Sequence, residues 1–228
     1  MLEEWEKAEQ GKKYLADVES EKQPTAPIEV KPIPQEYRPF TDEETKKLIK
    51  DGAVIFSLIG ETIEHQRTTG RLFRYIADGG DRLLKLPSIK TQVAIYPDPR
   101  RFFIPNSGNK DLPTQEKLTE KDGQELRKRL GLKDDGVDVI IPDQASTLTE
   151  LIFQHLDKTT KKGNPVWLFG EDYGYLYGRT KNPVNESGSH VAYVGDAYPD
   201  YGVSVNDWNA DDGHDRLRVV RLIVAKKK

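Results

Sequence analysis

The alternation of apolar and polar residues predicts helices in the middle of the chain and short strands in its last third. A helix is expected over residues 42–50, because Thr41 can act as its N-cap and Glu44 can complete a capping box. The continuous apolar run at 53–60 has the length of a buried strand. Residues 61–80 fit a helix or a strand, and the pattern does not decide between them.

Two longer stretches are typical of helices. Residues 112–132 have a proline near the start, strong helix formers throughout and Gly131 at the end, and residues 146–163 carry apolar positions at helical spacing. Strands are expected at 91–97, 100–105 and 137–143, and then in a series of short β-rich pieces at 165–170, 173–180, 190–196, 202–208 and 217–224. Because glycine, proline and asparagine separate these last pieces, they suggest an antiparallel sheet.

The pattern therefore predicts the α+β class, with a single domain over residues 41–228 and a mainly antiparallel, β-rich C-terminal third. Residues 1–40 are interpreted as an arm outside that domain. It would consist of a helix with few apolar positions, followed by an extended proline-rich segment. The arm carries six Lys or Arg and nine Asp or Glu, so it is acidic. Its composition suggests docking on a partner protein or on a second copy of the chain.

Composition narrows the class further. The 228 residues include no cysteine, which excludes disulfides, thiolate metal sites and a cysteine nucleophile. The charged N-terminus does not resemble a signal peptide, and no apolar run reaches the roughly 18 residues of a membrane span. A soluble, cytoplasmic protein is the simplest interpretation. The net charge of −3 argues against nucleic-acid binding.

One segment is strongly acidic. The 34 residues between Lys181 and Arg216 contain no Lys or Arg and seven Asp or Glu, so a cation, a basic partner or solvent must compensate their charge. Within it, the D-x-N-x-D spacing of Asp207, Asn209 and Asp211 is what a calcium loop uses. The EF-hand pattern then fails, because Asp212 replaces the required glycine and Arg218 stands at the position of the bidentate glutamate. A looser Ca²⁺ or Mg²⁺ site including Asp215 and a polar turn both remain open.

Two histidines accompany the acidic residues. His190 opens an apolar strand and His214 lies in the acidic loop, so either could act as a catalytic acid or base, or could join a mixed metal site. The string "SHVAYVGDAY" at 189–198 resembles the histidine-bearing strand of NlpC/P60-type cysteine peptidases. The catalytic cysteine of those enzymes has no counterpart here, so their activity is not implied.

Tyrosines form a third candidate site. On a strand, Tyr173, Tyr175 and Tyr177 would share one face as a stacking platform for sugars or bases, and Arg179 could assist with an anion. The same row could instead pack beneath a neighbouring element.

The sequence is therefore compatible with three functions. The first is an interaction or assembly protein that docks through residues 1–40. The second is a divalent-metal-dependent hydrolase or nuclease centred on the acidic C-terminal loop. The third is a carbohydrate- or nucleotide-binding module that uses the tyrosine row. The absence of a complete catalytic motif favours the first, and the sequence does not establish whether the protein is an enzyme.

Overall fold

The computed structural model describes residues 37–133 and 136–227. The chain divides into two units, residues 1–32 and 33–228, and all described residues belong to the second. The helix expected near the N-terminus and most of the proline-rich arm lie outside the described residues. The last four residues of the expected arm are described: Tyr37 and Arg38 form a short strand, and Phe40 is buried in a hydrophobic cluster.

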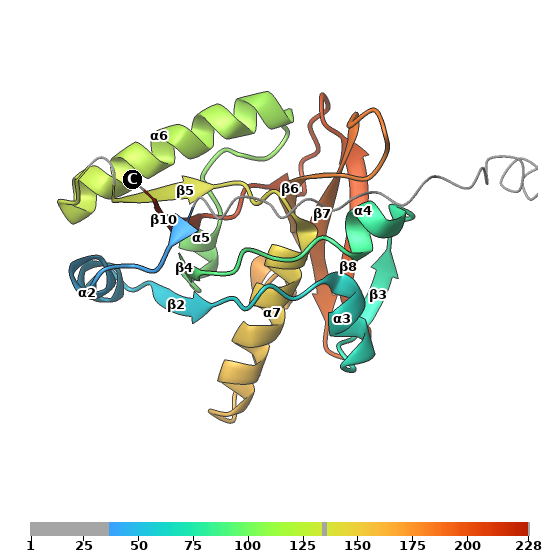
Figure 1. Cartoon of the computed structure of the whole chain (residues 1–228), viewed down its shortest axis with the longest axis horizontal. Helices are drawn as coiled ribbons and strands as arrows, with labels where there is room; N and C mark the ends of the chain where they lie inside the picture. Colours follow the sequence, from blue (N-terminus) through green and yellow to red (C-terminus); the bar gives the residue numbers. More distant parts are fainter. Residues whose placement is uncertain (1–36, 134–135, 228) are drawn as a thin grey trace, which may run out of the picture. The chain divides into compact units, whose positions relative to one another are not determined.

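Sheet A contains five antiparallel strands: β1 (Tyr37–Arg38), β2 (Val54–Ser57), β4 (Gln92–Ile95), β5 (Val137–Ile140) and β10 (Leu222–Lys226). β10 pairs with β1, β4 and β5, while β2 pairs with β4 at the end of the sheet. The helices α2 (Asp42–Lys50) and α6 (Leu112–Leu130) cover one face, and their Leu48 and Leu126 belong to the same buried cluster as Ile223 of β10 (Figure 1).

Sheet B contains β3 (Phe73–Ile76), β6 (Tyr177–Pro183), β7 (His190–Tyr198), β8 (Gly202–Asn209) and β9 (Leu217–Arg218). The strand order is β3-β8-β7-β6-β9. The three long central strands are antiparallel, whereas β3 and β9 join the two edges in parallel. The predicted α+β class with a β-rich C-terminal region is confirmed.

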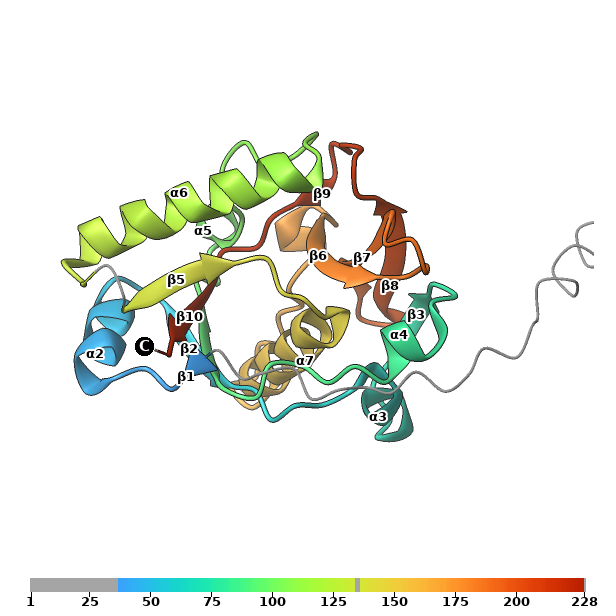
Figure 2. The ribbon, with the colours of Figure 1, turned by 45° about the horizontal axis from the view of Figure 1, so that its top comes forward.

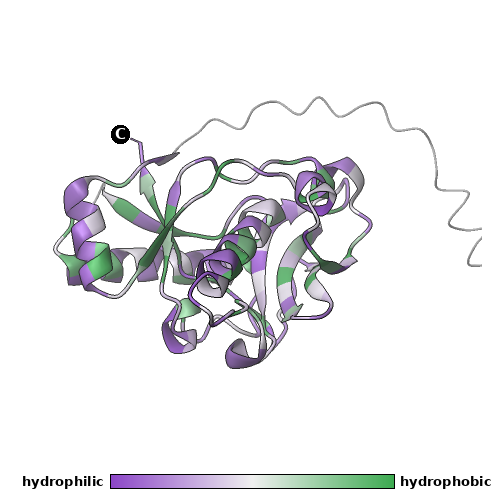
Figure 3. Cartoon of the chain, turned by 90° about the horizontal axis from the view of Figure 1, so that it is seen from below, coloured by the Kyte–Doolittle hydropathy of each residue, from purple (hydrophilic) through white to green (hydrophobic). Residues whose placement is uncertain are grey.

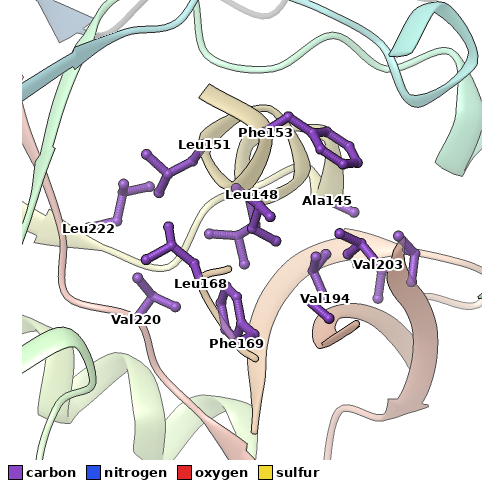
Figure 4. Close-up of a cluster of buried hydrophobic side chains, with 14 of the residues drawn as sticks. Ala145, Leu148, Leu151, Phe153, Leu168, Phe169, Val194, Val203, Val220 and Leu222 are labelled. Atoms are coloured by element: carbon purple, nitrogen blue, oxygen red, sulfur yellow. The ribbon is translucent and has the colours of Figure 1, made fainter. Parts of the chain in front are cut away.

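The helix α7 (Ala145–Thr160) lies between the two sheets (Figure 2). Figure 4 shows the resulting core, in which Leu148 and Leu151 of α7 lie near Leu222 of sheet A and near Val194 and Val203 of sheet B. The short elements α3 (Ile63–Thr68), α4 (Gly80–Leu84), α5 (Pro99–Phe102) and η1 (Glu171–Tyr173) complete the unit. Hydrophobic residues concentrate on the strands and on the inner sides of the helices (Figure 3). None of the described helices is both long and apolar enough to cross a membrane.

Local signals set the helix ends as expected. The Thr41 hydroxyl accepts a hydrogen bond from the Glu44 amide, and the Glu44 carboxylate accepts one from the Thr41 amide, so the predicted capping box is present. Gly131 ends α6 in the left-handed conformation, at φ 59°. The undecided stretch 61–80 contains both kinds of element, because α3 precedes β3.

Three strand predictions were wrong in detail. The expected strand at 100–105 begins as the helix α5, because Asp98 caps it and Pro99 occupies its first turn. The piece at 165–170 forms no strand, and Phe169 there has φ 63°. The run at 217–224 does not form one strand, because β9 pairs in sheet B and β10 pairs in sheet A.

Candidate functional site

Sheet B has an inner face, which packs on α7, and an outer face, which points away from it. Directly paired residues of an antiparallel ladder share a face, and Val194 pairs with Val205 on the inner side. By the same alternation Tyr193 of β7 and Trp208 of β8 lie on the outer face, and Tyr177 pairs with Gly195 on that face. Three aromatic side chains from three adjacent strands therefore gather on the outer face.

These rings enclose a small cavity with the loop that follows β8. The Tyr177 and Tyr193 ring centroids are 4.7 Å apart in an edge-to-face arrangement, and those of Trp208 and His214 are 5.1 Å apart. With Leu217, these four side chains line a cavity of about 30 Å³. The indole Nε1 of Trp208 is buried and has no hydrogen-bond partner among the described residues. A buried indole N–H normally finds an acceptor, so this one stands out.

An ionic network borders the cavity. The Arg216 guanidinium lies 5.1 Å from the centre of the Tyr177 ring, and its Nη2 is 3.3 Å from Asp196 Oδ1. Arg74 Nη1 is 3.0 Å from the other oxygen of Asp196. Burial and then the Asp196 charge raise the pKa of Tyr177 to about 12, and burial also raises the pKa of Tyr193. Both phenols are therefore neutral hydrogen-bonding groups at neutral pH.

More tyrosines continue the outer surface beyond this network. Arg74 lies 4.9 Å from the ring centre of Tyr198, which stacks on Tyr175 with 4.6 Å between centroids. Tyr201 contacts Tyr198 edge-on and is 65% exposed. We call the set Tyr175, Tyr177, Tyr193, Tyr198 and Tyr201 the tyrosine surface.

The tyrosine row expected at 173–177 is not formed. Gly174 and Tyr175 both have positive φ, at 63° and 49°, so the chain turns sharply after η1 and β6 begins only at Tyr177. Tyr173 points into the core, is 3% exposed and donates to the Pro97 carbonyl at 2.7 Å. Tyr175 and Tyr177 remain on the outer surface, but they pack against Tyr198 and Tyr193 rather than lying in one row with Tyr173.

Arg179, expected beside the tyrosines as an anion ligand, is completely buried beneath the acidic loop. Its guanidinium donates to the backbone oxygens of Asp212 at 2.8 Å, Asn209 at 3.3 Å and Lys110 at 3.5 Å. Burial lowers its pKa to about 10, which leaves it charged at neutral pH. The acidic loop therefore folds around a cation that the chain itself supplies.

The two candidate histidines lie on different faces of sheet B. His190 pairs with Asn209 on the inner-face register, and its Nδ1 is 2.7 Å from Asp207 Oδ2. His214 packs on Trp208 at the outer face, and its Nδ1 accepts a hydrogen bond from the Arg216 amide at 3.2 Å. His190 and His214 therefore do not form one site.

The candidate metal ligands are also separated. Asp207 forms a hydrogen bond with His190. The Asn209 side chain accepts a hydrogen bond from the Asp211 amide at 2.9 Å, which is an Asx turn. Asp215 is exposed and lies 3.3 Å from His214 Nδ1. Within residues 37–133 and 136–227, no three His, Asp or Glu side chains are placed to hold one metal ion.

In comparisons with known proteins, no family model, no curated protein and no solved structure matches the chain. Tyr193, Trp208 and Leu217 were not among the residues predicted from the sequence. The alternation in "VSVNDW" places Trp208 on the same side as Ser204 and Asn206, which could have marked it as an outward-facing aromatic residue. Tyr193 alternates with Val191 and carries no such signal.

Proposed function

We propose that this protein is a binding module for a neutral, hydroxyl-rich ligand of the saccharide class. The observation that carries the proposal is the cavity lined by Tyr177, Tyr193, Trp208 and His214, together with the indole N–H of Trp208, which is buried and has no hydrogen-bond partner among the described residues. An oxygen acceptor from outside the protein would satisfy that donor. Sugars supply such oxygens together with apolar ring faces that stack on aromatic side chains.

The size of the site suits one ligand group inside and the remainder outside. A cavity of about 30 Å³ accommodates a single hydroxyl or hydroxymethyl group and excludes a whole ring. The tyrosine surface continues from it through Arg216, Asp196 and Arg74. A saccharide anchored in the cavity would find both stacking rings and charged hydrogen-bonding groups along this path.

Charge favours a neutral ligand. The segment from 182 to 215 carries seven acidic residues and no basic residue, which disfavours a polyanion such as a nucleic acid. A cationic ligand is disfavoured as well, because Arg216 already occupies the neighbourhood of the Tyr177 ring.

The test is saturation-transfer NMR with a panel of neutral oligosaccharides, followed by calorimetry on any that bind. Trp208→Phe removes the N–H and keeps an aromatic ring, so it should weaken binding about fivefold to tenfold, the value of one hydrogen bond of about 1 kcal/mol. Trp167→Phe is the matched control because Trp167 lies outside the cavity, and it should bind as the parent does. The proposal fails if no saccharide binds, if both variants bind equally, or if adenosine monophosphate binds more tightly than any sugar.

The other two functions have less support. Docking through residues 1–40 stays a prediction, since residues 1–36 lie outside the described part of the chain. The metal-dependent hydrolase has no supporting cluster among the described residues.

A further inference from the structure

A groove far from the aromatic cavity runs beside the free edge of sheet A. It has a volume of about 570 Å³ and lies between β2 and the C-terminal half of α7. Ile55, Phe56 and Ser57 form its β2 side, and Gln154 and Asp157 begin its α7 side. This groove belongs to neither the aromatic cavity nor the tyrosine surface.

β2 offers backbone groups to this groove. Its only strand partner within the described residues is β4, so its second edge is open. The Leu58 amide donates to the Thr91 oxygen at 2.9 Å, and the alternation of an antiparallel ladder then turns the backbone groups of Ile55 and Ser57 away from β4. The Gln154 side chain already donates to the Ser57 oxygen at 3.0 Å. An extended peptide could pair with the remaining groups.

The α7 side of the groove is positively charged. Lys158, Lys161 and Lys162 line it, and none of them forms an ion pair with another described residue. The one acidic lining residue, Asp157, is neutralised by Arg71, whose two terminal nitrogens lie 2.8 and 2.5 Å from its carboxylate oxygens. The groove therefore carries an uncompensated charge of three lysines.

The neighbouring His155 reports the same positive field. It is buried beneath the groove, with its ring centroid 5.9 Å from that of Phe56. Burial, followed by the charges of Lys158 and Lys162, lowers its pKa to about 4. Lys158 Nζ itself lies 5.1 Å from the centre of the Phe56 ring.

We infer that this groove binds an acidic, extended segment of a partner protein, which adds to β2 as a further strand while its carboxylates face the lysines. The open edge favours a peptide over a nucleic acid, because only a peptide backbone continues a β-ladder. A second copy of the same edge is disfavoured, because symmetric pairing of two β2 strands would bring two lysine clusters together.

The experiment is fluorescence anisotropy with a labelled peptide in which glutamate alternates with valine and threonine. Two further peptides serve as ligand controls: one has lysine in place of glutamate, and one keeps the glutamates but has proline at alternate positions, so that it cannot form a strand. A single-stranded oligonucleotide is the fourth probe. The full chain is used throughout.

Three variants locate the binding surface. Lys158→Glu/Lys161→Glu/Lys162→Glu reverses the charge of the groove, and Lys50→Glu/Lys117→Glu/Lys128→Glu makes the same change at exposed positions elsewhere. Ile55→Pro blocks the outward N–H of β2, and edge strands tolerate proline at such positions. Circular dichroism verifies that each variant is folded.

We expect the acidic strand-forming peptide to bind at least tenfold more tightly than either control peptide. Binding should be lost in the groove triple variant, be weakened about tenfold by Ile55→Pro and survive in the control triple variant. Equal loss in both triple variants would overturn the inference, and so would equal binding of the proline-containing peptide or tighter binding of the oligonucleotide. Concentration-dependent dimerisation that the groove variant abolishes would assign the groove to a second copy instead.

Discussion

The guanidinium of Arg179 donates a hydrogen bond to the backbone oxygen of Asp212 across 2.8 Å, from a strand of sheet B to the acidic loop above it. The same side chain reaches the backbone oxygens of Asn209 and Lys110, and no part of it is exposed. A planar guanidinium suits this role because its donors diverge toward several acceptors at once. The arginine thus holds the loop that closes the aromatic cavity.

Arg179→Met should destabilise the fold by about 2–3 kcal/mol, because it leaves buried carbonyl oxygens without donors. Amide hydrogen exchange should accelerate over residues 210–216 more than elsewhere. Urea denaturation and exchange mass spectrometry measure the two effects. Arg100→Met is the control, since the Arg100 side chain is 91% exposed, and it should change neither quantity. If amide exchange over residues 210–216 were equally fast in both variants, Arg179 would not hold the loop.

Trp208→Phe should change the free energy of unfolding by less than about 1 kcal/mol in the absence of ligand. The smaller ring loses packing, but the substitution also removes a buried donor whose lack of a partner costs about 1–3 kcal/mol. Trp208→Ala should cost clearly more, because it also opens the cavity. A large loss of stability in Trp208→Phe would mean that the indole N–H is already satisfied in the folded protein.

Stability should depend on pH through His155. Its pKa is about 4 in the folded protein against an ordinary 6.5, so the unfolded chain takes up a proton first as the pH falls. The stabilisation is complete above about pH 6.5 and is lost toward about pH 4, with a limit of about 3 kcal/mol. Urea denaturation between about pH 4 and 6.5 should show that the free energy of unfolding depends less on pH in His155→Gln than in the parent protein. The exposed His65→Gln should keep the parent slope.

Glu150→Gln should destabilise the protein by about 2–3 kcal/mol. The buried Glu150 carboxylate accepts hydrogen bonds from the amides of Ile59 and Glu61 at 2.8 and 3.1 Å, from Gln154 at 2.9 Å and from the Ser88 hydroxyl. Each oxygen serves two donors, so an amide nitrogen in either place would face donors instead of accepting from them. Thermal unfolding measures the loss, and the exposed Glu64→Gln should show none.

The elements that depend on local signals could be predicted from the sequence. The capping box of Thr41 and Glu44 and the glycine end at Gly131 are encoded within a few residues, and both were found where expected. The helix α5 was missed because the apolar residues after Arg101 suggested a strand, while Asp98 and Pro99 started a helix turn. Local capping outweighed the apolar pattern there.

The candidate site depended on pairings that no local pattern contains. Tyr177, Tyr193 and Trp208 meet because β6, β7 and β8 are neighbours in a particular register, and a one-residue shift would have turned Trp208 to the other face. His190 and His214 both lie in the acidic segment and could have joined one site, but strand alternation places them on different faces. The role of Arg179 could not be predicted either, because the backbone oxygens that accept its hydrogen bonds come from two segments far from it in the sequence.

The last described strand, β10, pairs with three strands that all precede it in the sequence. During synthesis β1, β4 and β5 would leave the ribosome long before their shared partner. Sheet A therefore cannot be completed until β10 has been synthesised, because β1, β4 and β5 each pair with it. The order of the strands thus makes completion of sheet A a late step in the folding of this unit.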